Sequence, residues 1–121
     1  MKKDKFEVIL FELPNKTCPV LKFIKTLDKK MAAKLFGLMD ILAEVGNDLR
    51  EPYSKNLGDG IFELRAKISS DVTRMLYFFC IGHKIVITNG FVKKTNKTPQ
   101  SEIQLAKKYR DLYLKEHNLK R

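Results

Sequence analysis

The sequence lacks the features that mark several protein classes. It has no tryptophan, two cysteines and no apolar run longer than residues 75–81, which is far short of the ~20 residues of a membrane-spanning helix. Cys18 and Cys80 belong to no CxxC pattern or Cys/His cluster, so neither a zinc site nor a disulfide framework is predicted. The first ten residues alternate charged with apolar side chains and show no signal-peptide pattern. These absences predict a cytoplasmic protein without a metal or other cofactor.

Standard catalytic motifs are absent as well. The sequence contains no GxSxG, HExxH, P-loop or GxGxxG pattern, and no pair of carboxylates at a spacing that suits a cleft. Its two histidines, His83 in a predicted hairpin turn and His117 near the end of the chain, are interpreted as surface residues. An enzyme with this sequence would therefore act by cationic stabilisation and positioning, with a lysine or an unusual group as proton acceptor.

Acidic residues are outnumbered. Lys and Arg total 24 against 14 Asp and Glu, which gives a formal net charge of +10 over 121 residues. A hydrophobic fraction of 44% is enough for a folded core, so the surplus lies on a folded surface that attracts nucleic acid, the ribosome, an anionic membrane or an acidic protein. Most of this surplus positive charge lies after residue 83. The simpler interpretation of these basic residues is that they form the solvent-exposed face of a terminal helix. The length predicts one domain, residues 1–121.

The first half of the chain reads as a strand, two helices and a loop. The β-rich run 6–13 ends at a Pro-Asn turn signal. Pro19 lies near the start of an apolar stripe with helical spacing, which predicts a first helix. Asp28 as N-cap and Gly46 as terminator bound a second helix. Residues 47–60 are rich in polar residues, Pro and Gly, and predict a loop.

The second half reads as three strands and a helix. Connections of hairpin length separate three β-type runs, at residues 61–68, 73–81 and 84–92. Thr98 and Pro99 are predicted to open the last helix as its N-cap and first residue. The predicted buried stripe of this helix comprises Ile103, Ala106, Tyr109, Leu112 and Tyr113. The order βααβββα predicts the α+β class, with a small antiparallel or mixed β-sheet packed against helices.

Two arginines are expected to meet on this sheet. Period-two alternation places Glu63 and Arg65 on one face of their strand, and Arg74 begins the next strand of the hairpin. Lys93 and Lys94 follow the third strand and add to the same patch. Such a cationic site can hold a phosphodiester and stabilise extra negative charge in a transition state. A surface ion pair between Glu63 and Arg65, worth little, is the alternative.

Three stretches of sequence together carry a family resemblance. They are YSKNLGDGIFELR at 53–65, RMLYFF at 74–79, and GFVKKT at 90–95, which continues through a Thr-Pro pair into Glu-Ile and Ala-Lys pairs. Their order and spacing, from about residue 50 to 115, resemble the phage-derived HigB-like toxins of the RelE/ParE superfamily. The resemblance implies the toxin half of a type II toxin–antitoxin pair, with a compact RelE-like fold and cleavage of mRNA on the translating ribosome.

The resemblance also implies a chemistry and its residues. A ribose 2′-hydroxyl attacks the adjacent phosphate without a metal, which requires in-line positioning, charge stabilisation and two proton transfers. Carried over by position, Arg65 and Arg74 bind the scissile phosphate. Lys93 and Lys94 serve charge stabilisation or proton transfer. No residue after the Gly-Phe strand matches the late Tyr or His that related nucleases use, so the general acid and base stay open.

Three further residues are expected to bind RNA. Lys55 in the predicted loop contacts the backbone, and Lys97 extends the lysine cluster after the last strand. Phe91 has two possible roles: it stacks on a base, or it packs in the core. The core role is at least as well supported, because aromatic residues in strands usually pack inward.

The resemblance implies binding partners and leaves alternative functions open. The expected partners are a cognate helix-turn-helix antitoxin of the HigA-like kind, mRNA and ribosomal RNA, with no membrane. The ParE branch of the same superfamily poisons DNA gyrase by binding, and fold alone does not separate the two activities. A basic nucleic-acid or ribosome-binding module without activity is the third possibility.

Overall fold

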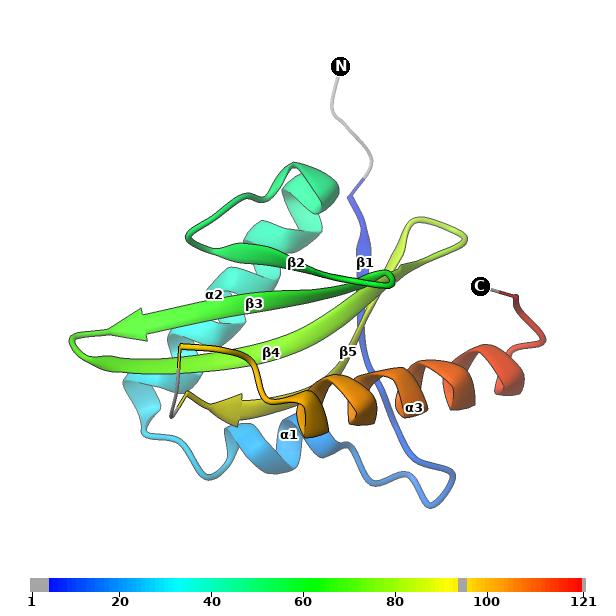
Figure 1. Cartoon of the computed structure of the whole chain (residues 1–121), viewed down its shortest axis with the longest axis horizontal. Helices are drawn as coiled ribbons and strands as arrows, with labels where there is room; N and C mark the ends of the chain where they lie inside the picture. Colours follow the sequence, from blue (N-terminus) through cyan, green and yellow to red (C-terminus); the bar gives the residue numbers. More distant parts are fainter. Residues whose placement is uncertain (1–4, 94–95, 121) are drawn as a thin grey trace.

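A five-stranded mixed sheet in the order β1-β5-β4-β3-β2 organises the chain (Figure 1). The computed structural model describes residues 5–93 and 96–120. The strands are β1 (Glu7–Leu10), β2 (Ser54–Gly58), β3 (Ile61–Ile68), β4 (Asp71–Cys80) and β5 (Lys84–Val92). The helices are α1 (Pro19–Ile24), α2 (Lys29–Val45), the short 3-10 helix η1 (Gly46–Asp48) and α3 (Gln100–Glu116). β1 pairs in parallel with β5, and the other neighbours are antiparallel. The predicted α+β class is confirmed.

The boundaries of α1 and α2 follow the predicted capping signals. Pro19 is the first residue of α1, and the Asp28 carboxylate accepts the Met31 N–H at 2.8 Å at the start of α2. Gly46 ends α2 with φ +51°, and a Cβ there would lie 2.1 Å from the Phe6 ring. A larger residue at this position would therefore meet both backbone strain and a clash. Among the described residues, no helix combines the length and apolar character needed to cross a membrane.

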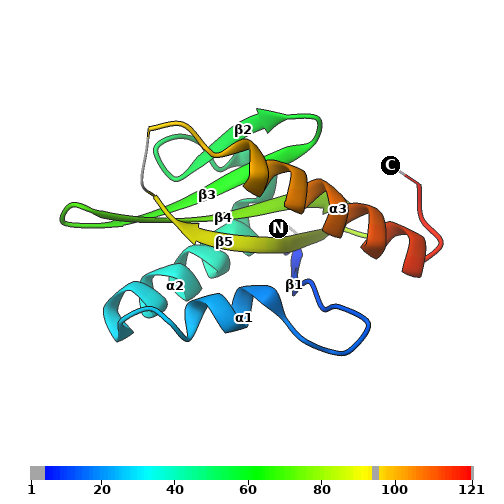
Figure 2. The same ribbon diagram turned by 60° about the horizontal axis from the view of Figure 1, so that its bottom comes forward.

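The sheet lies between two layers of helix (Figure 2). On one face, α1 and α2 cover a cluster of buried side chains that includes Leu64, Met75 and Ile87. On the other face, α3 covers a second cluster that includes Ile61 and Leu76. Full burial of an aliphatic side chain contributes about 1.5–3 kcal/mol, so these clusters hold the sheet rigidly. The sheet is thus a fixed platform for side chains at its uncovered parts.

Two of the three strands in the central hairpins have the predicted bounds, and the third differs from its prediction at both ends. The runs 61–68 and 84–92 are confirmed, whereas β4 starts two residues before the predicted 73 and ends at Cys80. Ser69 and His83 adopt positive φ in the two connecting turns, which gives the tight reversals that antiparallel hairpins need. The antiparallel pairing of these strands is therefore as predicted, while β4 and β5 shift register between Leu76 and Tyr77.

The predicted loop over residues 47–60 contains an additional strand. β2 pairs with β3, which changes the order to βααββββα. The segment Ser54–Gly58 is mostly polar. It forms an edge strand that pairs only with β3, so its sequence lacks the hydrophobic alternation by which strands are recognised. The buried Ser54 hydroxyl lies 2.6 Å from the hydroxyl of Tyr77, which ties β2 to β4 across β3.

The last helix buries a different stripe from the predicted one. The predicted members that are buried are Ile103, Ala106 and Tyr113. Leu112 is exposed instead, while Leu114 and Arg110 are buried. The Arg110 guanidinium donates to the backbone carbonyl of Asp59 and lies 3.3 Å from its carboxylate. A buried arginine inside an apolar stripe is invisible to hydrophobic patterning, because its partner lies on the turn between β2 and β3.

Candidate functional site

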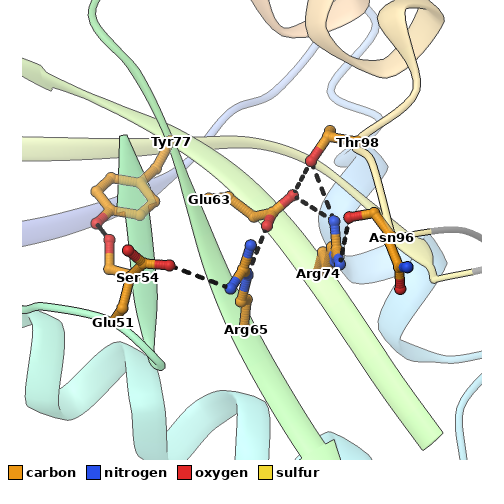
Figure 3. Close-up of polar contacts among 8 residues, drawn as sticks. All are labelled: Glu51, Ser54, Glu63, Arg65, Arg74, Tyr77, Asn96 and Thr98. Atoms are coloured by element: carbon orange, nitrogen blue, oxygen red, sulfur yellow. Dashed lines mark hydrogen bonds and ion pairs between the residues drawn. The ribbon is translucent and has the colours of Figure 1, made fainter. Parts of the chain in front are cut away.

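Arg65 and Arg74 lie on adjacent strands, as predicted, and are direct partners across β3 and β4, with Glu63 in contact with both. Arg65 Nε donates to Glu63 Oε1 at 2.8 Å, and Arg74 Nη1 donates to Glu63 Oε2 at 3.2 Å (Figure 3). The Glu63 side chain is fully buried. The alternative of a surface ion pair between Glu63 and Arg65 is therefore wrong: the carboxylate is a buried bridge between two guanidinium groups.

The segment that leads into α3 closes the same network. Thr98 donates its hydroxyl to Glu63 Oε2 and accepts from Arg74 Nη1 at 3.1 Å. Arg74 Nη2 donates to the carbonyl of Asn96 at 3.4 Å (Figure 3). The predicted N-cap role of Thr98 is wrong, because its hydroxyl is used in this network and Pro99 occupies the cap position. Arg74 thereby ties the chain before α3 to the middle of the sheet.

A hollow of about 240 Å³ opens beside this network. Five of the side chains that line it are cationic: Lys34, Arg65, Lys67, Arg74 and Lys93. The other lining residues are Pro52, Tyr53 and Val72. We call this the cationic hollow. Positive charge gathered at a concave surface attracts a phosphate and stabilises charge that develops on it.

The two arginines differ in what they offer a ligand. Arg65 is 22% exposed and lines the cationic hollow, with Glu63 on one side and the Glu51 carboxylate 3.7 Å away. Arg74 is 3% exposed, and its two Nη groups donate to Glu63, Thr98 and Asn96, while its buried Nε has no hydrogen-bond partner among the described residues. Arg65 is thus the arginine that a ligand can reach, while Arg74 holds other parts of the site in place.

The remaining predicted site residues are spread over several surfaces. Lys93 lines the cationic hollow, and its N–H donates to the carbonyl of Val72 at 2.9 Å. Lys94 lies outside the described residues. Lys55 is exposed on β2 and lines a separate hollow of about 410 Å³. Phe91 packs against the cluster beneath α3, which favours the core interpretation of this residue. Lys97, in the segment before α3, is exposed.

Besides Pro52 and Val72, three residues of the hollow did not figure in the predicted site. Lys67 follows Glu63 and Arg65 at a spacing of two on β3, so strand alternation would have placed it on their face. Tyr53 precedes β2, and its carbonyl accepts the N–H of Arg65 at 2.8 Å. Lys34 belongs to α2, and nothing in its local sequence distinguishes it from the other lysines of that helix.

A buried tyrosine supports the site from the opposite face of the sheet. Burial raises the pKa of Tyr77 above its ordinary value, and the hydrogen bond with Ser54 partly offsets this. The neutral phenol is therefore the form that the fold favours. Its link to Ser54 fixes the start of β2 close to Arg65 and Tyr53.

No group of three or more His, Cys, Asp and Glu side chains that could hold a metal ion occurs within residues 5–93 and 96–120. In a comparison with protein families, the model described as "Phage derived protein Gp49-like (DUF891)" matches residues 22–111. That range includes the network of Glu63, Arg65, Arg74 and Thr98 and all residues that line the cationic hollow. No curated protein matches the chain.

Proposed function

Because this chain belongs to the family of Gp49-like phage-derived proteins, which includes RelE/HigB-like toxins, we propose that it is the toxin of a type II toxin–antitoxin pair and cleaves mRNA on the ribosome. The observation that supports this proposal best is the cationic hollow, where five basic side chains surround a space large enough for a phosphodiester group. The surplus of positive charge on the whole chain favours approach to ribosomal RNA.

The proposed reaction is attack of a ribose 2′-hydroxyl on the adjacent phosphorus. The new bond forms between the 2′-oxygen and phosphorus, the bond to the 5′-oxygen breaks, and the first product ends in a 2′,3′-cyclic phosphate. Arg65 binds a non-bridging phosphate oxygen, because it lines the hollow and is partly exposed. Glu63 holds Arg65 Nε and so orients the guanidinium. Preorganised donors of this kind stabilise the charge of the transition state.

Two protons move in this reaction, one from the 2′-hydroxyl to a base and one from an acid to the leaving 5′-oxygen. Lys93, directly after β5, and Lys67 on β3 line the hollow and are our candidates for these transfers. Arg74 is a positioning residue in this scheme, since its contacts hold Glu63 and the segment before α3.

The test is cleavage of a defined mRNA on translating ribosomes, followed by mapping of the RNA ends. We expect cuts with the wild-type protein and a loss of about 100-fold or more in rate for Arg65→Ala. Lys108→Ala is the matched control, because Lys108 is exposed on α3 and does not line the cationic hollow. Circular dichroism and urea unfolding verify that Arg65→Ala is folded.

Two results would contradict the nuclease proposal, and a third would contradict the proposed position of its active site. Intact mRNA together with inhibition of DNA gyrase would favour the ParE-like alternative. Intact mRNA with tight ribosome binding would favour a non-catalytic module. Undiminished cleavage by Arg65→Ala would remove the cationic hollow as the active site.

We also propose a cognate antitoxin with a helix-turn-helix domain, because a nuclease of this kind must be held inactive in its host. Its test is co-expression: a small helix-turn-helix gene next to this one should restore growth to cells that produce the chain. Continued growth arrest in the presence of the co-expressed protein would overturn the pairing.

A further inference from the structure

Tyr53 presents an exposed aromatic ring on the wall of the cationic hollow. Tyr53 is 51% exposed and lines the hollow together with Pro52, Arg65 and Lys67. Its backbone is fixed on both sides: the N–H donates to the carbonyl of Arg50 at 3.0 Å, and the carbonyl accepts from Arg65 N–H at 2.8 Å. The ring therefore projects from a fixed point next to the arginine that is exposed to a ligand.

The exposure of this ring is unusual for the chain. Most aromatic side chains that the structure describes pack in the two clusters, as Phe11, Tyr77 and Tyr113 do. Among the Phe and Tyr residues that the structure describes, Phe36 is the other exposed one, at 43%, and it lies on α2 outside the cationic hollow. Tyr53 thus combines an exposed aromatic residue with neighbouring cations, the two elements from which proteins build sites for single-stranded nucleic acid.

We propose that the ring of Tyr53 is a stacking subsite for an unpaired nucleobase next to the phosphate that binds in the cationic hollow. This inference rests on the proposed function in that the phosphate belongs to an RNA strand. It specifies single-stranded RNA, because a base must be free of its own neighbours to stack on a side chain. Every base has a π-face, so the subsite tolerates all four bases.

The test is a direct binding measurement without ribosomes. The probe is a short single-stranded RNA, 2′-O-methylated throughout so that no 2′-hydroxyl can attack, with 2-aminopurine at each position in turn. We expect binding to quench 2-aminopurine fluorescence at one position for the wild-type protein and for Tyr53→Phe. Tyr53→Leu should lose the quenching and raise Kd about tenfold, because stacking of a base on an aromatic ring contributes about 1–3 kcal/mol.

Two controls separate stacking from other effects. Phe36→Leu removes the other exposed ring and should change neither quenching nor Kd. A probe with an abasic site at the quenched position should bind wild type and Tyr53→Leu equally, which a general loss of folding in the variant would not produce.

The outcomes of this test and of the cleavage assay are distinguishable. Equal quenching and Kd for wild type and Tyr53→Leu, or no quenching at any position in the wild type, would overturn the subsite while ribosome-dependent cleavage stands. Quenching that depends on Tyr53, in a protein that leaves mRNA intact on ribosomes, would support the subsite and overturn the nuclease.

Discussion

Arg65 and Arg74 lie opposite each other on β3 and β4, and the carboxylate of Glu63 contacts both. Two guanidinium groups at paired positions repel each other unless a negative charge lies between them. Glu63 supplies that charge from a fully buried position, and the Thr98 hydroxyl satisfies one of its oxygens further. The network is therefore a single unit, in which the exposed Arg65 depends on the buried members for its orientation.

The first prediction concerns Glu63. Glu63→Gln should lower the free energy of unfolding by about 3–5 kcal/mol, because it leaves the buried Arg74 charge without its counter-charge. Urea unfolding at neutral pH measures the change. Glu51→Gln is the control: that carboxylate is 67% exposed and 3.7 Å from Arg65, so its loss should cost less than about 1 kcal/mol. Equal effects of the two substitutions would contradict the bridging role of Glu63.

The second prediction separates the two arginines. Arg74→Ala should lower the free energy of unfolding by about 3–5 kcal/mol, because the buried Glu63 carboxylate loses a charged partner. Arg65→Ala should cost about 1–2 kcal/mol, since Arg65 is partly exposed and Arg74 still neutralises Glu63. Chemical denaturation of both variants provides the comparison. A greater loss for Arg65→Ala would mean that Arg65, not Arg74, is the structural partner.

The meeting of Arg65 and Arg74 was predictable from the sequence, because strand alternation and a short hairpin fix which residues face each other. The burial of Glu63 could not be predicted from the sequence. It depends on Thr98, which lies 35 residues further along the chain in the segment before α3. A local pattern reports the face of a strand on which a side chain lies. It does not report what another element later places over that face.

The residues of the cationic hollow show the same limit of prediction from local sequence. Arg65 and Lys93 were singled out by residue type and by place in the predicted strands, and both line the hollow. Lys34 reaches it from α2, and Tyr53 from the connection before β2, so only tertiary packing brings them together. β2 itself was missed because a polar edge strand carries no hydrophobic alternation.

The third prediction uses two glycines with opposite surroundings. Gly37 lies inside α2, where an added Cβ meets nothing within 4 Å. Gly37→Ala should stabilise the protein by about 0.5–1 kcal/mol, because alanine loses less backbone entropy in a helix. Gly90 on β5 leaves no such space, since an added Cβ lies 2.6 Å from the Phe23 ring. Gly90→Ala should destabilise by about 1–3 kcal/mol. Thermal unfolding compares both with wild type, and a stabilising Gly90→Ala would show that α1 does not pack on β5 as described.

The fourth prediction concerns alkaline pH and Tyr77. Burial raises its pKa in the folded state above the ordinary 10.0. The unfolded chain therefore loses this proton at a lower pH than the folded chain does. The stabilisation is complete below pH 10 and is lost as pH rises from there through the folded-state pKa. At pH 7, Tyr77→Phe should cost about 1 kcal/mol through loss of the hydrogen bond to Ser54. Above pH 10 the deficit of Tyr77→Phe should shrink, because phenylalanine does not ionise in either state.

Urea unfolding at pH 7, 9 and 10.5 tests this expectation, with Ser54→Ala as the matched control. Ser54→Ala removes the same hydrogen bond and keeps the titrating phenol. It should therefore lose stability at pH 7 as Tyr77→Phe does, yet decline at alkaline pH at least as steeply as wild type. Removing Ser54 also removes the contact that lowers the pKa of Tyr77, so the folded-state pKa rises further and the alkaline loss grows. Parallel pH profiles for wild type and Tyr77→Phe would show that the phenol of Tyr77 ionises as easily in the folded as in the unfolded chain.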